Sequence, residues 1–286
     1  MPELRNVKCR SRAGLTLLEL VVVMAILIAI AGVLVPLLPD IVGRGNQSAS
    51  ATNMNELEKA IQFFQGQYNR YPNHYDSMIS GSEVSGLVPA AGSLGPGGGN
   101  LEARPLTKGQ VSRLSRRGIT MVYDIQDTIP EDTANFHATL NPYTDGTTYG
   151  NGRTLAEGGT IVMLTRGEDD TYNDDVFDRS VMPGVILNPD HDYAVFGIGK
   201  YCNLCGPDGV VREAPVHGQH KAQSSPVEEY SRFCVVYDIG PPDDDTSKVN
   251  AKFVGVVAIA GKRLFTAGDV SSRYRDAEFD LTQPPE

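Results

Sequence analysis

The chain has 286 residues, and its 25 lysines and arginines against 35 aspartates and glutamates give a formal net charge of −10. Such an acidic balance argues against nucleic acid or an anionic membrane surface as a partner. The length allows one large or two small folded units, and 30 glycines and 18 prolines without any tryptophan indicate a loop-rich structure.

A long apolar segment lies near the N-terminus. No charged residue occurs between Leu20 and Leu38, and the run from Leu15 onward is long enough to cross a bilayer as a helix. The residues before it are basic, with a single acid, Glu3, against Arg5, Lys8, Arg10 and Arg12. By the positive-inside rule, the N-terminus is expected in the cytoplasm. The pattern therefore predicts a single-pass inner-membrane protein with its head in the periplasm.

One acid, Glu19, lies within the apolar segment. A carboxylate there costs about 2.5 kcal/mol or more, so its default interpretation is functional. A secretory signal peptide explains the segment less well, because its apolar core spans about 7 to 15 residues and ends at an A-x-A-like site. A plain membrane anchor accounts for the length but gives no reason for Glu19.

The residues Gly14-Leu15-Thr16-Leu17-Leu18-Glu19 resemble the class III signal of type IV pilins and type II secretion pseudopilins. The resemblance implies that a prepilin peptidase cuts after Gly14 and that Leu15, in place of the usual phenylalanine, becomes the methylated N-terminus. Glu19 then matches the glutamate at the fifth mature position, and Pro36 matches the proline that kinks the family's helix.

The proposed roles of these residues have a physical basis. Cleavage would leave a cationic amine on Leu15, and Glu19 lies about one helical turn further along the same face. In a filament, the amine of one subunit can pair with the carboxylate of a neighbour. The free-energy cost of burying the two charges is therefore offset only when subunits stack. Pro36 lacks a backbone N–H and bends or locally melts the helix.

A second helical pattern follows the apolar segment. Apolar residues recur there at spacings of three and four positions: Met54, Leu57, Ile61, Phe64 and Tyr68. This spacing predicts an amphipathic helix that runs to about Asn69 and is stopped by Pro72. The domain organisation is thus a cleaved leader (1–14), a transmembrane helix (15–38), its amphipathic continuation (39–72) and an exported pilin-like head with a C-terminal extension (73–286).

The head is expected to be mainly β. Leu106 to Arg117 predicts a short basic helix, and we interpret the charges of Arg113, Arg116 and Arg117 as a solvated face. Short β-branched or aromatic runs predict strands at Ile119–Ile125, Thr160–Leu164, Tyr193–Phe196, Phe233–Ile239 and Phe253–Ile259. The fold class is therefore predicted as α+β, with a long N-terminal helix (transmembrane half plus amphipathic half) packed on an antiparallel sheet.

An acidic segment follows the second predicted strand. It resembles the calcium-binding loop of the major pseudopilin, and the resemblance places Asp169, Asp174 and Asp175 on the acidic positions, with Asp170 where glycine is usual. Oxygen-rich loops of this kind suit calcium. The alternative is a solvated acidic turn.

Two cysteines and two histidines form a further candidate cluster, Cys202-Asn203-Leu204-Cys205 and His217-Gly218-Gln219-His220. Together they could hold zinc in a tetrahedral site, although the histidines are closer in sequence than is usual. A disulfide between Cys202 and Cys205, or between either one and Cys234, is the second alternative, and free thiols are the third.

Catalytic motifs are not found. The sequence has no G-x-S-x-G, H-E-x-x-H or P-loop, and His74, His137 and His191 are interpreted as surface histidines. The chain is therefore predicted to be a pseudopilin-like structural subunit rather than an enzyme. Its expected partners are other pseudopilin subunits, a prepilin peptidase and an inner-membrane assembly platform. The alternative function is a membrane-anchored periplasmic binding domain, with or without a metal.

Overall fold

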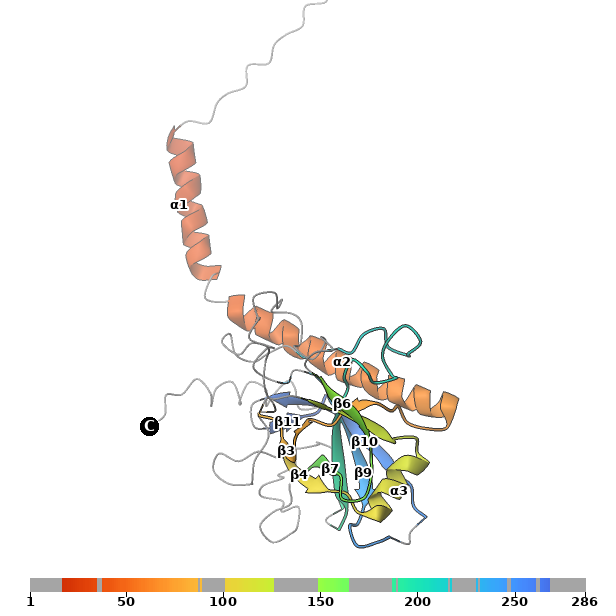
Figure 1. The fold of residues 1–286 in the computed structure, drawn as a ribbon. Helices are drawn as coiled ribbons and strands as arrows, with labels where there is room; N and C mark the ends of the chain where they lie inside the picture. Colours follow the sequence, from red (N-terminus) through yellow and green to blue (C-terminus); the bar gives the residue numbers. More distant parts are fainter. Residues whose placement is uncertain are drawn as a thin grey trace, which may run out of the picture. The chain divides into compact units, whose positions relative to one another are not determined.

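The computed structural model describes two N-terminal helices and a large β-sheet (Figure 1). The described residues are 17–34, 38–86, 88, 101–125, 149–164, 187–188, 190–215, 217, 230, 232–245, 248–260 and 263–267. The chain divides into two compact units, residues 1–44 and 45–286, and each is described by itself.

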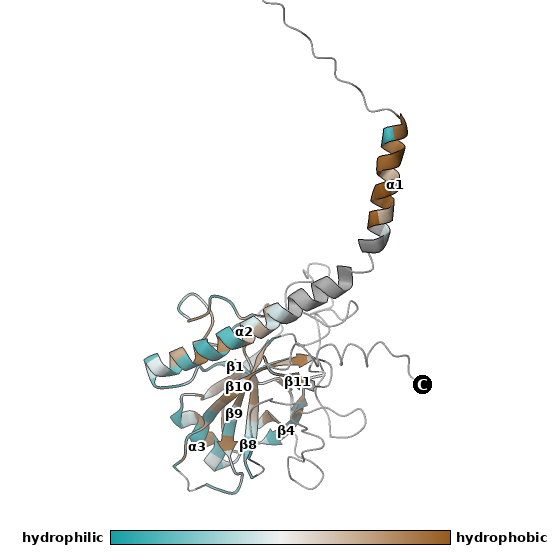
Figure 2. Ribbon diagram, turned by 180° about the vertical axis from the view of Figure 1, so that it is seen from behind, coloured by the Kyte–Doolittle hydropathy of each residue, from teal (hydrophilic) through white to brown (hydrophobic). Residues whose placement is uncertain are grey.

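Three helices occur in the described residues: α1 (Leu17–Leu34), α2 (Leu38–Tyr68) and α3 (Lys108–Arg116). α1 is apolar on every side, whereas the second half of α2 alternates apolar and polar residues (Figure 2). The apolar stripe of α2 is buried at Met54, Leu57, Ile61 and Phe64, while Tyr68 is 46% exposed. α2 ends before Asn69, which has a φ of 53°, a left-handed conformation that asparagine tolerates better than most residues.

Within the described part of the chain, nine strands form one sheet, in the order β11-β10-β9-β8-β1-β5-β6, and the β4–β7 pair joins it through β8. The five strands that the sequence predicted are all present: β5 (Met121–Ile125), β7 (Thr160–Leu164), β8 (Asp192–Gly197), β9 (Cys234–Gly240) and β10 (Lys252–Ala260). The sequence patterns did not predict β1 (Tyr75–Asp76), β4 (Leu101–Pro105), β6 (Tyr149–Thr154) or β11 (Arg263–Phe265), nor the separate hairpin of β2 (Ile79–Ser80) and β3 (Glu83–Val84).

The sheet is mixed rather than antiparallel. β1 pairs with β5 in parallel, with Tyr75 opposite Val122 and Asp76 opposite Tyr123, whereas the other strand pairs among the described residues are antiparallel. A parallel pair needs a crossover connection, and the segment between β1 and β5 supplies it with α3. Because β1 has only two residues, no sequence pattern identified it.

Both faces of the central strands are buried. Along β8 and β9, one set of alternate side chains (Ala194, Phe196, Val235 and Tyr237) belongs to the core that also contains residues of α2 and α3. The other set (Tyr193, Val195, Cys234 and Val236) belongs to a second core that includes Met78 and Ile79. Successive side chains of a strand point to opposite faces, so each strand contributes to both cores.

The predicted fold class is wrong. The described residues contain no single long N-terminal helix packed on an antiparallel sheet, because α1 and α2 are separate elements and the sheet is mixed. The second half of α2 instead adds five buried residues to the first core: Met54, Leu57, Ala60, Ile61 and Phe64. The Glu58 carboxylate also accepts a hydrogen bond from the Val256 N–H at 3.1 Å.

The predicted membrane location is also contradicted. None of the helices in the described residues is both long enough and apolar enough to span a membrane. The transmembrane helix, the single-pass inner-membrane location and the periplasmic head are therefore not supported.

Candidate functional site

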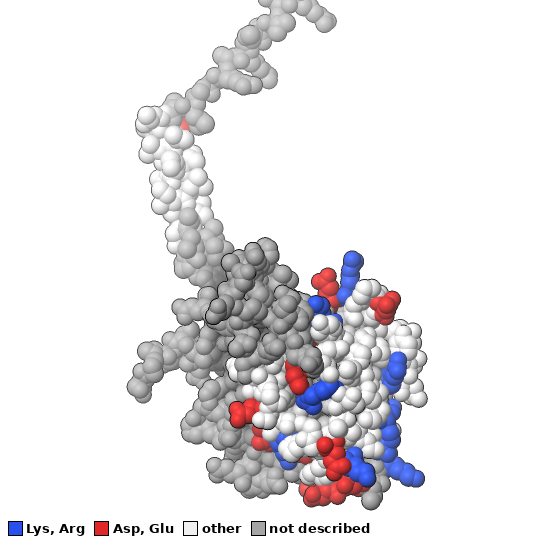
Figure 3. Space-filling model, viewed as in Figure 1, with Lys and Arg blue, Asp and Glu red and all other residues white. Residues whose placement is uncertain are grey.

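α1 contains Glu19, the acid of the N-terminal motif. Between Leu17 and Ile30, its large apolar side chains range from 48% exposed, at Val22, to 81% exposed, at Leu17. Glu19, in the first turn, is the one charged residue of the helix. Figure 3 accordingly shows α1 as almost entirely uncharged, whereas charges of both signs are spread over the visible face of the head.

Several predicted site residues lie outside the described residues. They are Gly14 and Leu15 at the predicted cleavage point, Pro36, the three acids Asp169, Asp174 and Asp175, and His220. Processing after Gly14 and calcium binding by the acidic loop therefore stay predictions.

The three described cysteines carry free thiols. Cys202 and Cys205 lie on one tight turn, and Cys234 lies in β9. Burial, and secondarily the charge of Cys205, raises the pKa of the Cys202 thiol. Burial raises the pKa of Cys205 to about 12, although the nearby Arg232 guanidinium acts in the opposite direction. Both thiols are therefore protonated at neutral pH and are weak nucleophiles.

The described residues do not assemble a zinc site. No group of three or more histidines, cysteines or acids suited to a metal ion occurs among them. His217 is buried, with its ring edge-on to Phe233 and the ring centroids 5.7 Å apart. The zinc prediction for Cys202, Cys205, His217 and His220 thus has no support from this part of the chain.

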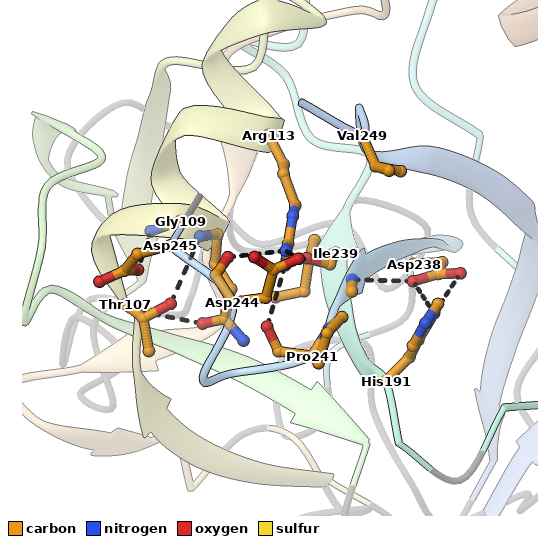
Figure 4. A network of polar contacts seen from close by, with 12 residues as sticks. Thr107, Gly109, Arg113, His191, Asp238, Ile239, Pro241, Asp244, Asp245 and Val249 are labelled. Atoms are coloured by element: carbon orange, nitrogen blue, oxygen red, sulfur yellow. Dashed lines mark hydrogen bonds and ion pairs between the residues drawn. The ribbon is translucent and has the colours of Figure 1, made fainter. Parts of the chain in front are cut away.

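A polar network is centred on Arg113 of α3 (Figure 4). Its Nη1 donates to the carbonyl oxygens of Ile239, at 2.8 Å, and Pro241, at 2.9 Å. Its Nη2 donates to the carbonyl oxygen of Asp244 at 2.8 Å and to that residue's Oδ2 at 3.0 Å. One guanidinium therefore connects α3 to the end of β9 and to the acidic turn that follows.

The start of α3 binds the same turn. The Gly109 N–H donates to Asp245 Oδ1 at 2.7 Å, and Thr107 and Gln110 form a reciprocal capping box. Acids near a helix N-terminus are stabilised by its unpaired N–H groups and its dipole. Asp244 and Asp245 therefore hold α3 at two points, one through Arg113 and one through Gly109.

The interpretation of Arg113 as part of a solvated face is wrong. Its side chain is only 1% exposed, and Gln110 and Leu114 on the same face of α3 are also buried. The guanidinium of Arg113 packs closely against Gly240, where an added Cβ would lie only 2.6 Å from Nη1. Gly240 also has a φ of 73°, so glycine is favoured at this position for both reasons. Residues 110, 113 and 114 are spaced as one face of a helix. This buried face was not predicted, because a charged residue such as Arg113 is normally expected in solvent.

A small cavity of about 180 Å³ lies beside this network, lined among others by Arg113, His191, Asp238 and Lys252. His191 Nδ1 lies 2.9 Å from both carboxylate oxygens of Asp238, and Asp238 Oδ1 also accepts from the Gly240 N–H at 2.8 Å. His191 is therefore partly buried and paired rather than a free surface histidine. The cavity combines charges of both signs, and four of the five N–H groups of Arg113 are committed to the protein.

Comparison of this chain with protein-family models, with curated protein sequences and with solved structures found no match.

Proposed function

We propose that the chain is a pseudopilin-like structural subunit that assembles through α1 into a type IV pilus-like filament or a secretion pseudopilus. One observation carries the proposal: α1 is apolar on every side, and its large side chains are exposed. A helix that is hydrophobic all round is normally buried, so a partner surface is required.

Copies of α1 are suitable partners for one another. Burying apolar surface contributes roughly 25 cal/mol per Å², and parallel helices of aliphatic residues can bury it by packing side by side. The second unit, residues 45–286, does not need α1 for its own stability, because its two cores are built from residues 54 to 265. In the proposed filament, α1 serves only as a packing surface for other subunits.

Glu19 would enter the core of such a bundle. A buried carboxylate requires a cation, and a Leu15 amine from a neighbouring copy, released by a prepilin peptidase, has the required charge. The peptidase and an assembly platform belong to the proposal through the resemblance of residues 14–19 to the family's signal. The role proposed for the chain is structural rather than catalytic.

The proposal is tested by a charge placed in α1. We expect Ile26→Lys to abolish self-association of the full chain, because a lysine in a helix bundle core would be buried without a partner. In-cell crosslinking and sedimentation of the extracted protein measure the effect. Val249→Lys is the matched control, because Val249 is 54% exposed on the head and Ile26 is 53% exposed on α1. Equal association of the two variants, or a monomeric parent chain, would contradict the proposal.

A second prediction concerns Glu19. Glu19→Ala should leave the melting temperature of the head unchanged, because Glu19 lies in the separate N-terminal unit. It should nevertheless reduce incorporation beside the parent subunit in a mixed crosslinking assay. Glu56→Ala removes an exposed acid from α2 and serves as the control. Normal incorporation of Glu19→Ala would remove the role of this carboxylate in subunit register.

A further inference from the structure

Cys202 and Cys205 are the first and last residues of a β-turn. The Cys205 N–H donates to the Cys202 carbonyl oxygen at 2.9 Å, which is the i to i+3 hydrogen bond of such a turn. The turn brings its end residues within about 7 Å of each other at Cα, which covers most of the range that a disulfide bridges.

Backbone hydrogen bonds from the following residues also hold the turn. After it, the Gly206 N–H donates to the Val211 carbonyl oxygen and the Val211 N–H donates to that of Leu204, both at 2.9 Å. Gly206 has a φ of 109°, which permits the chain to reverse there. The two thiols are therefore preorganised by backbone hydrogen bonds rather than brought together by chance.

Cys234 is excluded from pairing with either of them. It belongs to the core on one face of the sheet, with its sulfur 3.5 Å from the sulfur of Met78. Cys202 belongs to the core on the opposite face, and Cys205 packs against that same core. A bridge to Cys234 would have to pass through the sheet.

We infer that Cys202 and Cys205 form a reversible disulfide that locks this turn, while Cys234 stays reduced. The oxidant is a low-molecular-weight disulfide, R–S–S–R. Its S–S bond breaks, the Cys202 Sγ–Cys205 Sγ bond forms, and the two thiol protons leave with two equivalents of R–SH. The pair loses two electrons and the small disulfide gains them. This inference does not depend on filament assembly.

The chemistry of the pair favours a stable bond. Burial raises the pKa of both thiols, and the neighbouring groups do not reverse this effect. A disulfide becomes strongly oxidising when its reduced form is held as a stabilised thiolate, and burial disfavours the thiolate of both cysteines here. The bond is therefore expected to act as a structural lock that forms slowly, rather than as an exchange catalyst.

The lock would act on the segment that follows α2. Asn203, between the two cysteines, accepts from the Asn73 N–H through its Oδ1 at 2.7 Å, and its own N–H donates to the Asn73 carbonyl oxygen at 3.1 Å. The Asn73 side chain in turn accepts from the Thr120 and Met121 N–H groups, at 2.9 and 3.0 Å. Fixing residues 202–205 therefore fixes the connection between α2 and β1 against β5.

The test treats the full-length folded protein with oxidised glutathione, and with dithiothreitol as its reduced reference. Intact mass should fall by two hydrogen atoms on oxidation, and peptide mapping should link Cys202 to Cys205. The oxidised form should melt about 4 to 8 °C above the reduced form, as estimated for closing a four-residue loop. Amide hydrogen exchange in residues 69–76 should slow at the same time.

Two variants separate the lock from a general effect of oxidation. Cys205→Ser replaces a partly exposed thiol and should abolish both the mass change and the shift in melting temperature. Cys234→Ser should preserve both. A link that involves Cys234, a persistent glutathione adduct on Cys205, or oxidation without any change in melting temperature or exchange would overturn the inference.

Discussion

Replacing Arg113 with alanine is expected to lower the free energy of unfolding of the head by about 3 to 5 kcal/mol, at roughly 1 kcal/mol for each lost hydrogen bond. The change removes four hydrogen bonds and leaves the carbonyl oxygens of Ile239, Pro241 and Asp244 without this donor. For a domain of this size the melting temperature should fall by roughly 6 to 20 °C. Urea denaturation followed by circular dichroism measures the loss directly.

The control is the next basic residue of the same helix. Arg116 is exposed, and its Nη2 donates to the Val249 carbonyl oxygen at 2.9 Å. Arg116→Ala should cost less than about 1 kcal/mol. Arg113→Lys should recover little of the loss, because one ammonium group cannot reproduce the planar fork of a guanidinium. Equal losses for the two alanine variants would show that the Arg113 network is not a major source of stability.

Gly197→Ala is expected to destabilise the head by about 3 to 5 kcal/mol, which combines overpacking with a lost hydrogen bond to a charged group. A Cβ at this position would collide with the hydroxyl of Tyr230. That hydroxyl donates to Asp76 Oδ2 at 2.7 Å, and both residues are buried. Relieving the collision therefore moves Tyr230 away from the buried carboxylate. Thermal unfolding monitored by calorimetry checks the prediction.

A glycine-to-alanine substitution in α2 should have the opposite effect on stability. Gly66 lies in α2, and nothing lies within 4 Å of a Cβ added there. Gly66→Ala should stabilise the protein by about 0.5 to 1 kcal/mol, because alanine loses less backbone entropy in a helix. A loss of stability at Gly66, or none at Gly197, would contradict the packing argument.

Short-range periodicity was sufficient to predict several elements. The stripe from Met54 to Phe64 has helical spacing and is buried, and each of the five runs of β-branched and aromatic residues corresponds to a strand. These patterns succeed because side-chain direction repeats every 3.6 residues in a helix and every two in a strand. The same reasoning failed for the N-terminal segment, because an apolar composition indicates a hydrophobic helix but not what surrounds it.

The sequence by itself determined the helical segments and the five strands rich in β-branched and aromatic residues, and which side chains in them are apolar. Only the tertiary structure decided the parallel pairing of β1 with β5, the burial of Arg113 and the separation of Cys234 from Cys202 on opposite faces of the sheet. Each of these depends on contacts between residues far apart in the chain, such as Arg113 with Asp244. Local patterns cannot specify such contacts, because the hydrogen bonds that make a buried charge tolerable come from whichever distant backbone the fold brings beside it.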